Sequence, residues 1–248
     1  MLLLATLCQP VLPFQGQPAT LVPPGSLPSA ETLHYSIEWR LFTAGRAHLA
    51  WASAGSGYQA DLQVESVGLV SKLFKVNDDY SSAMDRGLCA HSSLLKSSEG
   101  SRRRETRITF DQERKHASYV ERDTAKNTVL ATKEIEIPAC VSDIIGALYR
   151  MRTLDMDLGQ ARQVPVSDGK KSAMVRVEAQ QRDQIKTPAG VFKTVRYEAF
   201  LFNNVIYGRS GRVYVWLTED PRRLPVQIQV RLQLHIGTIT LQLEREGT

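Results

Sequence analysis

Residues with specialised chemistry are scarce in this sequence. Its 248 residues include only three cysteines, Cys8, Cys89 and Cys140, and no two of them have the Cys-x-x-Cys spacing of a zinc site. The sequence contains no phosphate-binding loop, no Gly-x-Ser-x-Gly nucleophile elbow and no dinucleotide-binding fingerprint. Its five histidines are dispersed along the chain. We therefore predict no metal and no cofactor, and we do not expect an enzyme.

A hydrophobic run long enough to cross a membrane is also missing. The apolar stretch at residues 2–7 is far shorter than the roughly 20 residues that a membrane-spanning helix needs. Residues 1–19 are instead typical of a secretory signal, although the basic start and the Ala-x-Ala site are missing. Leu7, before Cys8, is not the small residue that usually precedes a lipoprotein cysteine. We expect export to the periplasm or the outer cell envelope.

Residues 20–30 are rich in Pro, Gly and Ser, which predicts a flexible tether. The remaining residues, 31–248, then form a single antiparallel β domain. This length is sufficient to bury a sizeable core without a metal or a disulfide framework. Cys89 and Cys140 can pair if the compartment is oxidising, or they can remain two buried thiols, and the sequence leaves both open.

Charge of one sign does not dominate either. The chain has 31 Lys and Arg against 26 Asp and Glu, and the basic residues are scattered among acidic ones on the polar faces of predicted strands. We therefore expect no nucleic-acid partner. The short run Arg102–Arg104 is predicted to lie in a loop tip over residues 97–104. A solvated hairpin end is the favoured interpretation there, and contact with lipid headgroups or phosphate is the alternative.

What the sequence does have is a two-residue periodicity. In residues 226–236 every second residue is apolar, which predicts a strand with one dry and one wet face. Pro221 marks a turn that folds residues 213–217 back as a partner strand, and Trp216, opposite Val215, makes that partner apolar on both sides and therefore central. Similar strands are predicted in residues 33–41, 47–51 and 58–64. The predicted fold class is mainly β: a large curved antiparallel sheet or an incomplete β-barrel.

Two segments depart from this alternation. Residues 67–74 have the spacing of a short helical turn. Residues 141–152 predict a helix, because Ile144, Ile145, Leu148 and Met151 share one face, with Ser142 or a neighbour as its cap. This one covering helix must lie on the concave dry face of the sheet. We expect it to be the lid of an apolar cavity, with Ile145 and Leu148 facing the ligand.

Aromatic residues supply the other candidates for a ligand cavity. Each falls on a predicted strand, and together they are Tyr35, Trp39, Trp51, Tyr58, Tyr214 and Trp216. Aromatic side chains line many apolar ligand sites, but they also fill protein cores. Near residue 168, the pair Asp168-Gly169 predicts a type I′ hairpin turn.

Several stretches resemble a family of exported bacterial proteins known as a domain of unknown function. They are Glu31–Trp39, Phe74–Asp78, Ile144–Arg152, Thr187–Thr194 and Val215–Val226. The resemblance implies a β-rich protein of the bacterial envelope with no catalytic residues to carry over. The hairpin around Trp216 and Pro225 is also similar to that of periplasmic lipoprotein carriers, whose incomplete barrels hold acyl chains.

Three functions are consistent with the sequence. The first is the binding of a lipid or another apolar molecule within the curved sheet, without catalysis. The alternative is a structural or assembly factor that binds an envelope protein or a polysaccharide through a sheet edge or the polar face. The third is a hydrolase whose site is not recognisable from motifs.

Overall fold

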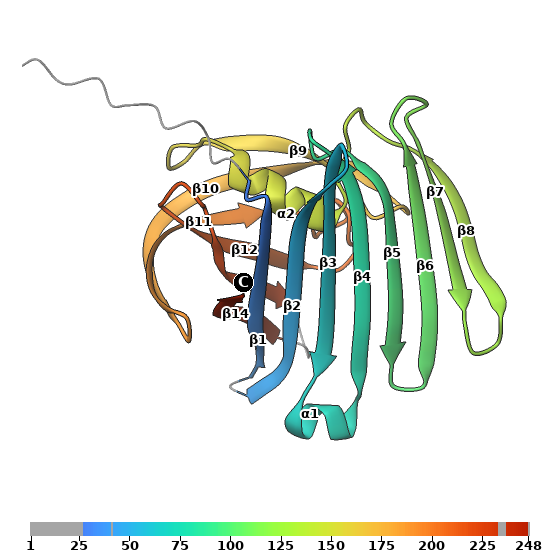
Figure 1. Ribbon diagram of the computed structural model, residues 1–248, viewed down its shortest axis with the longest axis horizontal. Helices are drawn as coiled ribbons and strands as arrows, with labels where there is room; N and C mark the ends of the chain where they lie inside the picture. Colours follow the sequence, from blue (N-terminus) through green and yellow to red (C-terminus); the bar gives the residue numbers. More distant parts are fainter. Residues whose placement is uncertain (1–26, 41, 233–236, 248) are drawn as a thin grey trace, which may run out of the picture.

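A single antiparallel sheet of fourteen strands makes up most of the molecule in the computed structural model, which describes residues 27–40, 42–232 and 237–247. The strand order is β8-β7-β6-β5-β4-β3-β2-β1-β14-β13-β12-β11-β10-β9. Within each of two meanders, β1–β8 and β9–β14, strands that are consecutive in the chain are neighbours in the sheet, and the pairing of β1 with β14 joins the two meanders (Figure 1). This architecture confirms the predicted mainly β fold class.

The first meander contains β1 (Ala30–Trp39), β2 (Phe42–Ala54), β3 (Gly57–Ser66), β4 (Val76–Asp85), β5 (Ala90–Glu99), β6 (Arg102–Asp111), β7 (His116–Asp123) and β8 (Thr128–Glu136). The second contains β9 (Ala161–Ser167), β10 (Ser172–Thr187), β11 (Gly190–Ala199), β12 (Gly211–Thr218), β13 (Pro225–Leu232) and β14 (Gly237–Gly247). The two helices are α1 (Gly68–Leu73), between β3 and β4, and α2 (Ile144–Thr153), between the meanders. In the described part of the chain, no helix is both long and apolar enough to span a membrane.

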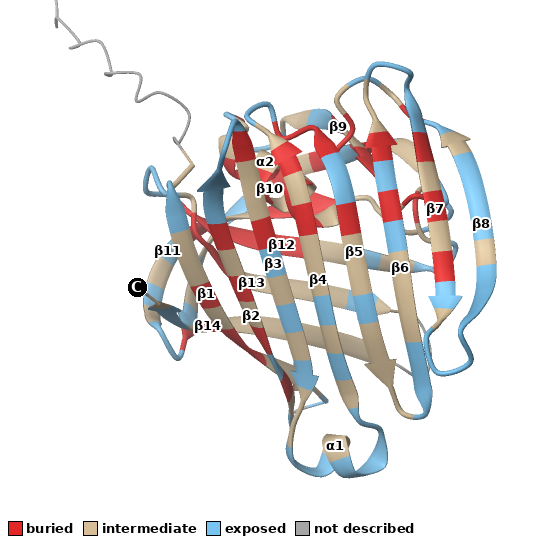
Figure 2. Cartoon of the chain, turned by 45° about the vertical axis from the view of Figure 1, so that its right-hand side comes forward, coloured by how far each residue is buried: buried red, intermediate tan, exposed pale blue. Residues whose placement is uncertain are grey.

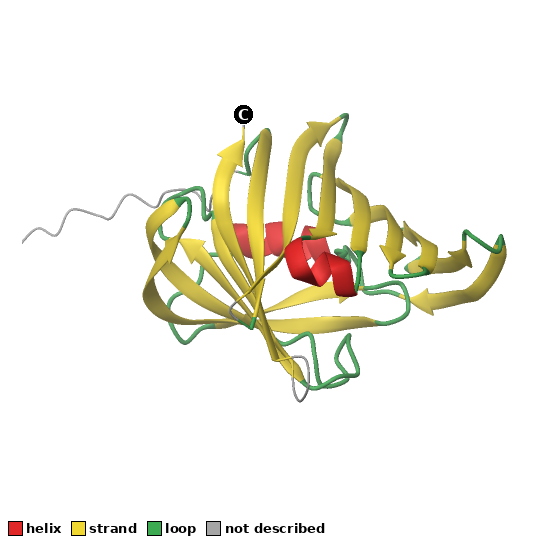
Figure 3. Ribbon diagram, turned by 90° about the horizontal axis from the view of Figure 1, so that it is seen from below, coloured by secondary structure: helices red, strands yellow, loops and turns green. Residues whose placement is uncertain are grey.

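The sheet curls into an incomplete barrel with α2 on its concave side (Figures 1 and 3). Its two outer strands, β8 and β9, do not pair with each other. Ser142 occupies the edge of β9 instead: its amide donates to the Pro165 carbonyl at 2.9 Å, and its carbonyl accepts from the Ser167 amide at 3.0 Å. One sheet edge is thus covered by the segment that leads into α2, whereas β8 has no such cover among the described residues.

Strand β12 illustrates how the alternation produces the core. It lies between β11 and β13, and both of its faces are buried. Val215 and Leu217 pack into the concave interior with β9–β11, while Trp216, 5% exposed, belongs to a different cluster on the other face. The sequence-based prediction of a central strand with two apolar faces is confirmed.

Two predictions about turns need correction. Arg102–Arg104 do not form a loop tip: β5 and β6 leave only Gly100 and Ser101 in the turn, and Arg104 is part of β6, where its guanidinium pairs with Glu121 of β7 at 2.7 Å. The turn at Asp168-Gly169 has four residues instead of the two of a type I′ hairpin. Only its Gly169 has positive φ, and there a Cβ would lie 2.8 Å from Ile108.

The predicted tether partly belongs to the folded body. Leu27 packs against the main core, and the Trp51 indole donates to the Pro28 carbonyl at 3.0 Å. The Ser53 amide donates to the Ser29 carbonyl at 2.7 Å. The signal-like segment 1–19, residues 20–26 of the tether and the end of the predicted strand 226–236 lie outside the described residues.

Candidate functional site

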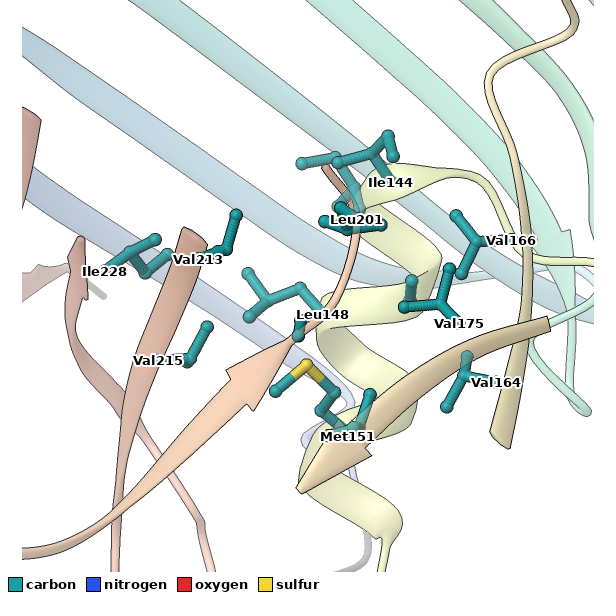
Figure 4. Close-up of a pocket in the computed structure, with 14 residues that line it drawn as sticks. Ile144, Leu148, Met151, Val164, Val166, Val175, Leu201, Val213, Val215 and Ile228 are labelled. Atoms are coloured by element: carbon teal, nitrogen blue, oxygen red, sulfur yellow. The ribbon is translucent and has the colours of Figure 1, made fainter. Parts of the chain in front are cut away.

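An apolar cavity of about 150 Å³ lies between α2 and the strands of the second meander (Figure 4). Its lining residues are all apolar: Ile144, Ile145, Ala147, Leu148, Met151, Val164, Val166, Val175, Val177, Ala199, Leu201, Val213, Val215 and Ile228. One wall is a face of α2 and the other is the concave face of β9–β13. No acid, base or nucleophile lines it, so the cavity can take up an apolar group but offers no catalytic side chain.

The N-terminus of α2 is fixed by Asp143. This carboxylate accepts from the Gly146 amide at 2.7 Å and from the Tyr80 hydroxyl of β4 at 2.6 Å. Asp143 is therefore the cap, whereas the Ser142 hydroxyl, the other predicted candidate, donates to the Leu88 carbonyl at 2.7 Å. Burial raises the pKa of Asp143, and burial together with the Asp143 charge raises the pKa of Tyr80.

The C-terminal turn of α2 is fixed by a buried cation. The Arg152 side chain is 1% exposed and pairs with the Glu31 carboxylate at the start of β1. It also donates to the Arg222 carbonyl at 3.0 Å, and its guanidinium lies 4.9 Å from the centre of the Tyr149 ring. A buried guanidinium without these partners is strongly destabilising, so the contacts set the position of the helix. With both ends held, α2 is a fixed wall of the cavity.

A disulfide between Cys89 and Cys140 strengthens the same region. Cys89 immediately precedes β5, and Cys140 lies in the segment that leads to α2. Nearby, the Arg150 guanidinium donates to the Gly87 carbonyl at 2.9 Å and to the Ser142 hydroxyl at 2.9 Å. The approach to α2 is thus tied to the β4–β5 turn covalently and by hydrogen bonds.

Of the eight predicted ligand-contacting residues, the structure places two in this cavity, Ile145 and Leu148. The six aromatic residues lie elsewhere. Trp51 stacks on Tyr149 of α2 and on Tyr58, with ring centres 3.7 Å and 4.5 Å apart, and the Tyr35 hydroxyl donates to the Pro225 carbonyl at 2.8 Å. These contacts are those of core residues.

The remaining three aromatic candidates are separated from the cavity by the sheet itself or by distance along it. Tyr214 and Trp216 alternate with Val213 and Val215, which line the cavity, and so point to the opposite face of β12. The Trp216 indole donates to the Asp183 carboxylate at 2.8 Å. Trp39 lines a second apolar pocket at the other end of the sheet.

Sequence reasoning missed most of the true lining. The valines of β9 and β10, Val164, Val166, Val175 and Val177, form much of the wall opposite α2. The alternation around Val175 and Val177 was visible in the sequence. The information that was missing is tertiary: only the folded sheet shows that these strands curl across the helix face that carries Leu148.

The second apolar pocket, of about 220 Å³, lies beside α1. Its lining includes Ile37, Trp39, Val64, Val70, Val76 and Ile239. Leu241 of β14 pairs with Ile37 of β1 on one side and with Ile228 of β13 on the other. Since Ile37 lines this pocket and Ile228 lines the cavity under α2, a row of apolar side chains connects the two across the concave face.

On the convex face, a polar groove of about 620 Å³ is lined by two histidines from neighbouring strands. His34 of β1 and His48 of β2 are cross-strand partners, and their rings stack with centres 4.5 Å apart. Partial burial lowers the pKa of His34, and the charges of Arg245 and His48 lower it further. Among the described residues, no group of three or more His, Cys, Asp or Glu is placed to hold a metal ion.

Comparison with solved structures supports the fold. A β-barrel-like protein of the domain of unknown function DUF1849 from Brucella abortus has a TM-score of 0.56, with 7% identity over 89% of this chain and 98% of its own. A DUF1089 family protein from Pseudomonas aeruginosa has a TM-score of 0.42, with 14% identity over 76% of this chain and 90% of its own. At these identities only the likeness of fold to the Brucella protein carries weight. No curated protein matches the sequence.

The family itself is established by sequence. Residues 34–244 match the model of the family described as "Protein of unknown function (DUF3108)". The matched range includes all or most of every strand, from β1 to β14, and both helices. It also confirms the resemblance to a domain of unknown function that the sequence motifs indicated. The chain belongs to the DUF3108 family.

Proposed function

We propose that this protein is exported to the bacterial envelope and there binds the acyl chain of a lipid, or a similar apolar molecule, in the cavity under α2. The observation that carries the proposal is the cavity's lining of fourteen apolar residues. An unfilled cavity of 150 Å³ forfeits roughly 3–4 kcal/mol of packing at about 24 cal/mol per Å³. A ligand that fills it recovers much of that energy.

The size and dryness of the cavity suit an apolar ligand. Engineered apolar cavities of about 150 Å³ stay free of water and bind molecules the size of benzene. A branch or the end of an acyl chain is of similar cross-section. The apolar row through Leu241 provides a path along which a longer chain extends toward the second pocket. The wholly apolar lining supports binding without catalysis.

The disulfide supports the proposed location. Structural disulfides persist in oxidising compartments such as the periplasm and are rare in the cytosol of mesophiles. Cys89 and Cys140 are bonded to each other at the point where the chain approaches α2. A protein with such a bond next to its candidate ligand site is suited to work in the periplasm or the outer envelope.

The test is binding of a fluorescent fatty-acid probe to the purified protein. Val175→Phe adds bulk inside the cavity and is expected to abolish binding while the circular dichroism spectrum stays that of a folded sheet. Val191→Phe, at a position 58% exposed, is the matched control and should bind as the wild type does. Native mass spectrometry of protein purified from its own envelope then identifies the ligand. A folded wild type that binds no probe at micromolar concentration contradicts the proposal.

A second candidate is an assembly factor that binds a partner chain at the edge of β8. This strand ends the sheet, and two of its large apolar side chains, Val129 and Leu130, are 54% and 47% exposed. An added strand would pair with the backbone groups on the outer side of β8, which have no partner strand in the described part of the chain. The two candidates differ in the same mass spectrum: a bound polypeptide favours this one, and bound lipid favours the first.

A further inference from the structure

The end of the sheet that carries α1 exposes an unusual number of large apolar side chains. None of the six residues of α1 is buried (Figure 2). Four of the nine large apolar side chains that are most exposed in the described chain lie in or near this turn: Phe42, 68%; Leu69, 68%; Leu73, 78%; and Phe74, 51%. Leu69 and Leu73 are four residues apart and share one face of the helix, while Val70 lines the pocket beneath.

These side chains form one surface because the turns that carry them are bonded together. The Val67 amide, at the start of α1, donates to the Ala44 carbonyl of β2 at 2.9 Å. The Gly100 amide, in the β5–β6 turn, donates to the Lys75 carbonyl after α1 at 2.7 Å. A Cβ on Gly100 would lie 3.0 Å from the Phe74 ring, so that ring rests on the neighbouring turn. We call this surface, formed by Arg40, Phe42 and residues 67–75 and 100–103, the α1 end.

The charge of the α1 end is entirely positive. It contains five exposed cations, Arg40, Lys72, Lys75, Arg102 and Arg103, and no acidic residue. Two acids border it: Glu99 is half-buried at the end of β5, and Glu65 of β3 is exposed and lines the second pocket. Apolar side chains ringed by Lys and Arg are the features of segments that lie in the interface of an anionic bilayer: the apolar groups enter the acyl boundary and the cations contact the headgroups.

The interior also opens toward this surface. Trp39, at the end of β1, and Val70, on the inner side of α1, both line the second apolar pocket. The Arg40 guanidinium lies 5.2 Å from the centre of the Trp39 ring. A tryptophan beside a basic residue is a common anchor at the membrane interface. A bilayer at the α1 end would therefore face the mouth of the apolar row inside the sheet.

We infer that the α1 end docks on the surface of an anionic lipid bilayer, with Leu69, Leu73 and Phe74 inserted among the lipids. This goes beyond the proposed ligand binding and does not depend on what occupies the cavity under α2. An uncharged apolar patch would fit a second copy of the chain equally well. Five cations facing five cations would repel, so the charge favours the bilayer.

The test is flotation with vesicles of phosphatidylglycerol and phosphatidylethanolamine, compared with phosphatidylcholine alone. Wild-type protein should float with the anionic vesicles, and salt should weaken this binding. The double variant Lys72→Gln/Lys75→Gln should bind roughly tenfold more weakly or worse, at about 1 kcal/mol per lysine. Leu69→Ser/Leu73→Ser should lose binding to a similar degree. Lys186→Gln/Lys193→Gln and Met174→Ser, at exposed positions elsewhere, should bind as the wild type does.

Tryptophan fluorescence tests whether the α1 end is the part of the protein that contacts the lipids. Trp51 and Trp216 are 1% and 5% exposed, so brominated lipids should quench the fluorescence of Trp39 alone, and Trp39→Phe should remove the quenching. The proposal is overturned if the wild type does not float with anionic vesicles. It is also overturned if the control variants lose as much vesicle binding as the α1-end variants, because binding would then reflect only the overall positive charge. A third outcome would also overturn the proposal: the wild type self-associates, does not bind vesicles, and loses its self-association in the variant Leu69→Ser/Leu73→Ser. A second copy of the chain would then be the partner.

Discussion

The two ends of the curled sheet are built in opposite ways. At the end that carries α2, the helix is capped, ion-paired and stacked, and a disulfide closes the approach to it. At the α1 end, a helix of six residues is held by a few backbone hydrogen bonds and leaves its leucines in solvent (Figure 2). One end is stabilised to keep a cavity in shape, and the other retains apolar surface that the fold itself does not use.

This difference separates stability from binding along the molecule. Substitutions near α2 remove buried contacts and should lower the free energy of unfolding by several kcal/mol. Substitutions in the α1 end remove side chains that are already exposed and should affect mainly the interaction with a surface outside the protein. The predictions below test this separation, beginning with the largest effect.

Replacing Trp51 by alanine should produce the largest loss of stability. Its ring is 1% exposed and stacks between Tyr149 and Tyr58, and its indole is hydrogen-bonded to Pro28. We expect Trp51→Ala to cost roughly 5 kcal/mol of unfolding free energy in urea denaturation, near the upper end for such a cavity. Trp39→Ala, at the α1 end, is the matched control and should cost less than half as much. Equal costs would show that the two ends do not differ in packing.

Removing the disulfide should produce the next largest effect. Cys89 and Cys140 are 51 residues apart, and in the chain-entropy model closing such a loop stabilises by about 4 kcal/mol. The double variant Cys89→Ala/Cys140→Ala should unfold at correspondingly lower urea concentration, and a reducing agent should shift the wild type in the same way but leave the variant unchanged. A wild type whose urea midpoint does not respond to complete reduction would contradict this prediction.

The cap of α2 should respond to pH. Burial raises the pKa of Asp143 above its ordinary value of 3.8, so this acid keeps its proton to a higher pH in the folded protein than in the unfolded chain. The stabilisation from this proton is fully present below about pH 3.8 and is lost as pH rises through the folded pKa. Asp143→Asn stays neutral, keeps an oxygen for the Gly146 amide, and allows the Tyr80 hydroxyl to reverse and accept.

The variant should therefore gain stability relative to the wild type as pH rises from about 4 to about 7. The measurement is urea denaturation of both proteins across that range, and the difference between them isolates Asp143 from the other carboxylates. A difference that is constant with pH would mean that the carboxylate titrates alike in the folded and unfolded chain.

Much of the fold was predictable from alternation, because a two-residue period fixes both the strand and the face that it buries. The predicted strand around Trp216 and the predicted helix with Ile145 and Leu148 on its apolar face correspond to β12 and α2. The turns were less predictable. Arg104 lies in β6, where it faces Asp123 of β7 in the register and forms a diagonal ion pair with Glu121, and these cross-strand neighbours are not apparent from the local sequence.

The candidate site was predictable only in part, for a similar reason. Ile145 and Leu148 were assigned from helical spacing alone, which is local information. The wall opposite them depends on how far β9–β12 curl over α2, which local periodicity does not determine. Aromatic residues were predicted to line the cavity because they are large and apolar. The fold places Trp51 against Tyr149 and leaves smaller aliphatic residues such as Val175 around the cavity.

The smallest expected effect on stability is at α1. It is the most direct test of the difference between the α1 end and the end that carries α2. Leu69→Ser and Leu73→Ser should each change the free energy of unfolding by less than about 0.5 kcal/mol, because side chains that are 68% and 78% exposed contribute little packing. Val70→Ser is the matched control on the inner side of the same helix, where it lines the apolar pocket, and it should cost more. If Leu73→Ser destabilised the protein as much as Val70→Ser, the leucines would be part of the core of the fold and their exposure would not indicate a binding surface. If it leaves stability unchanged and weakens vesicle binding, the exposed leucines serve a contact outside the chain.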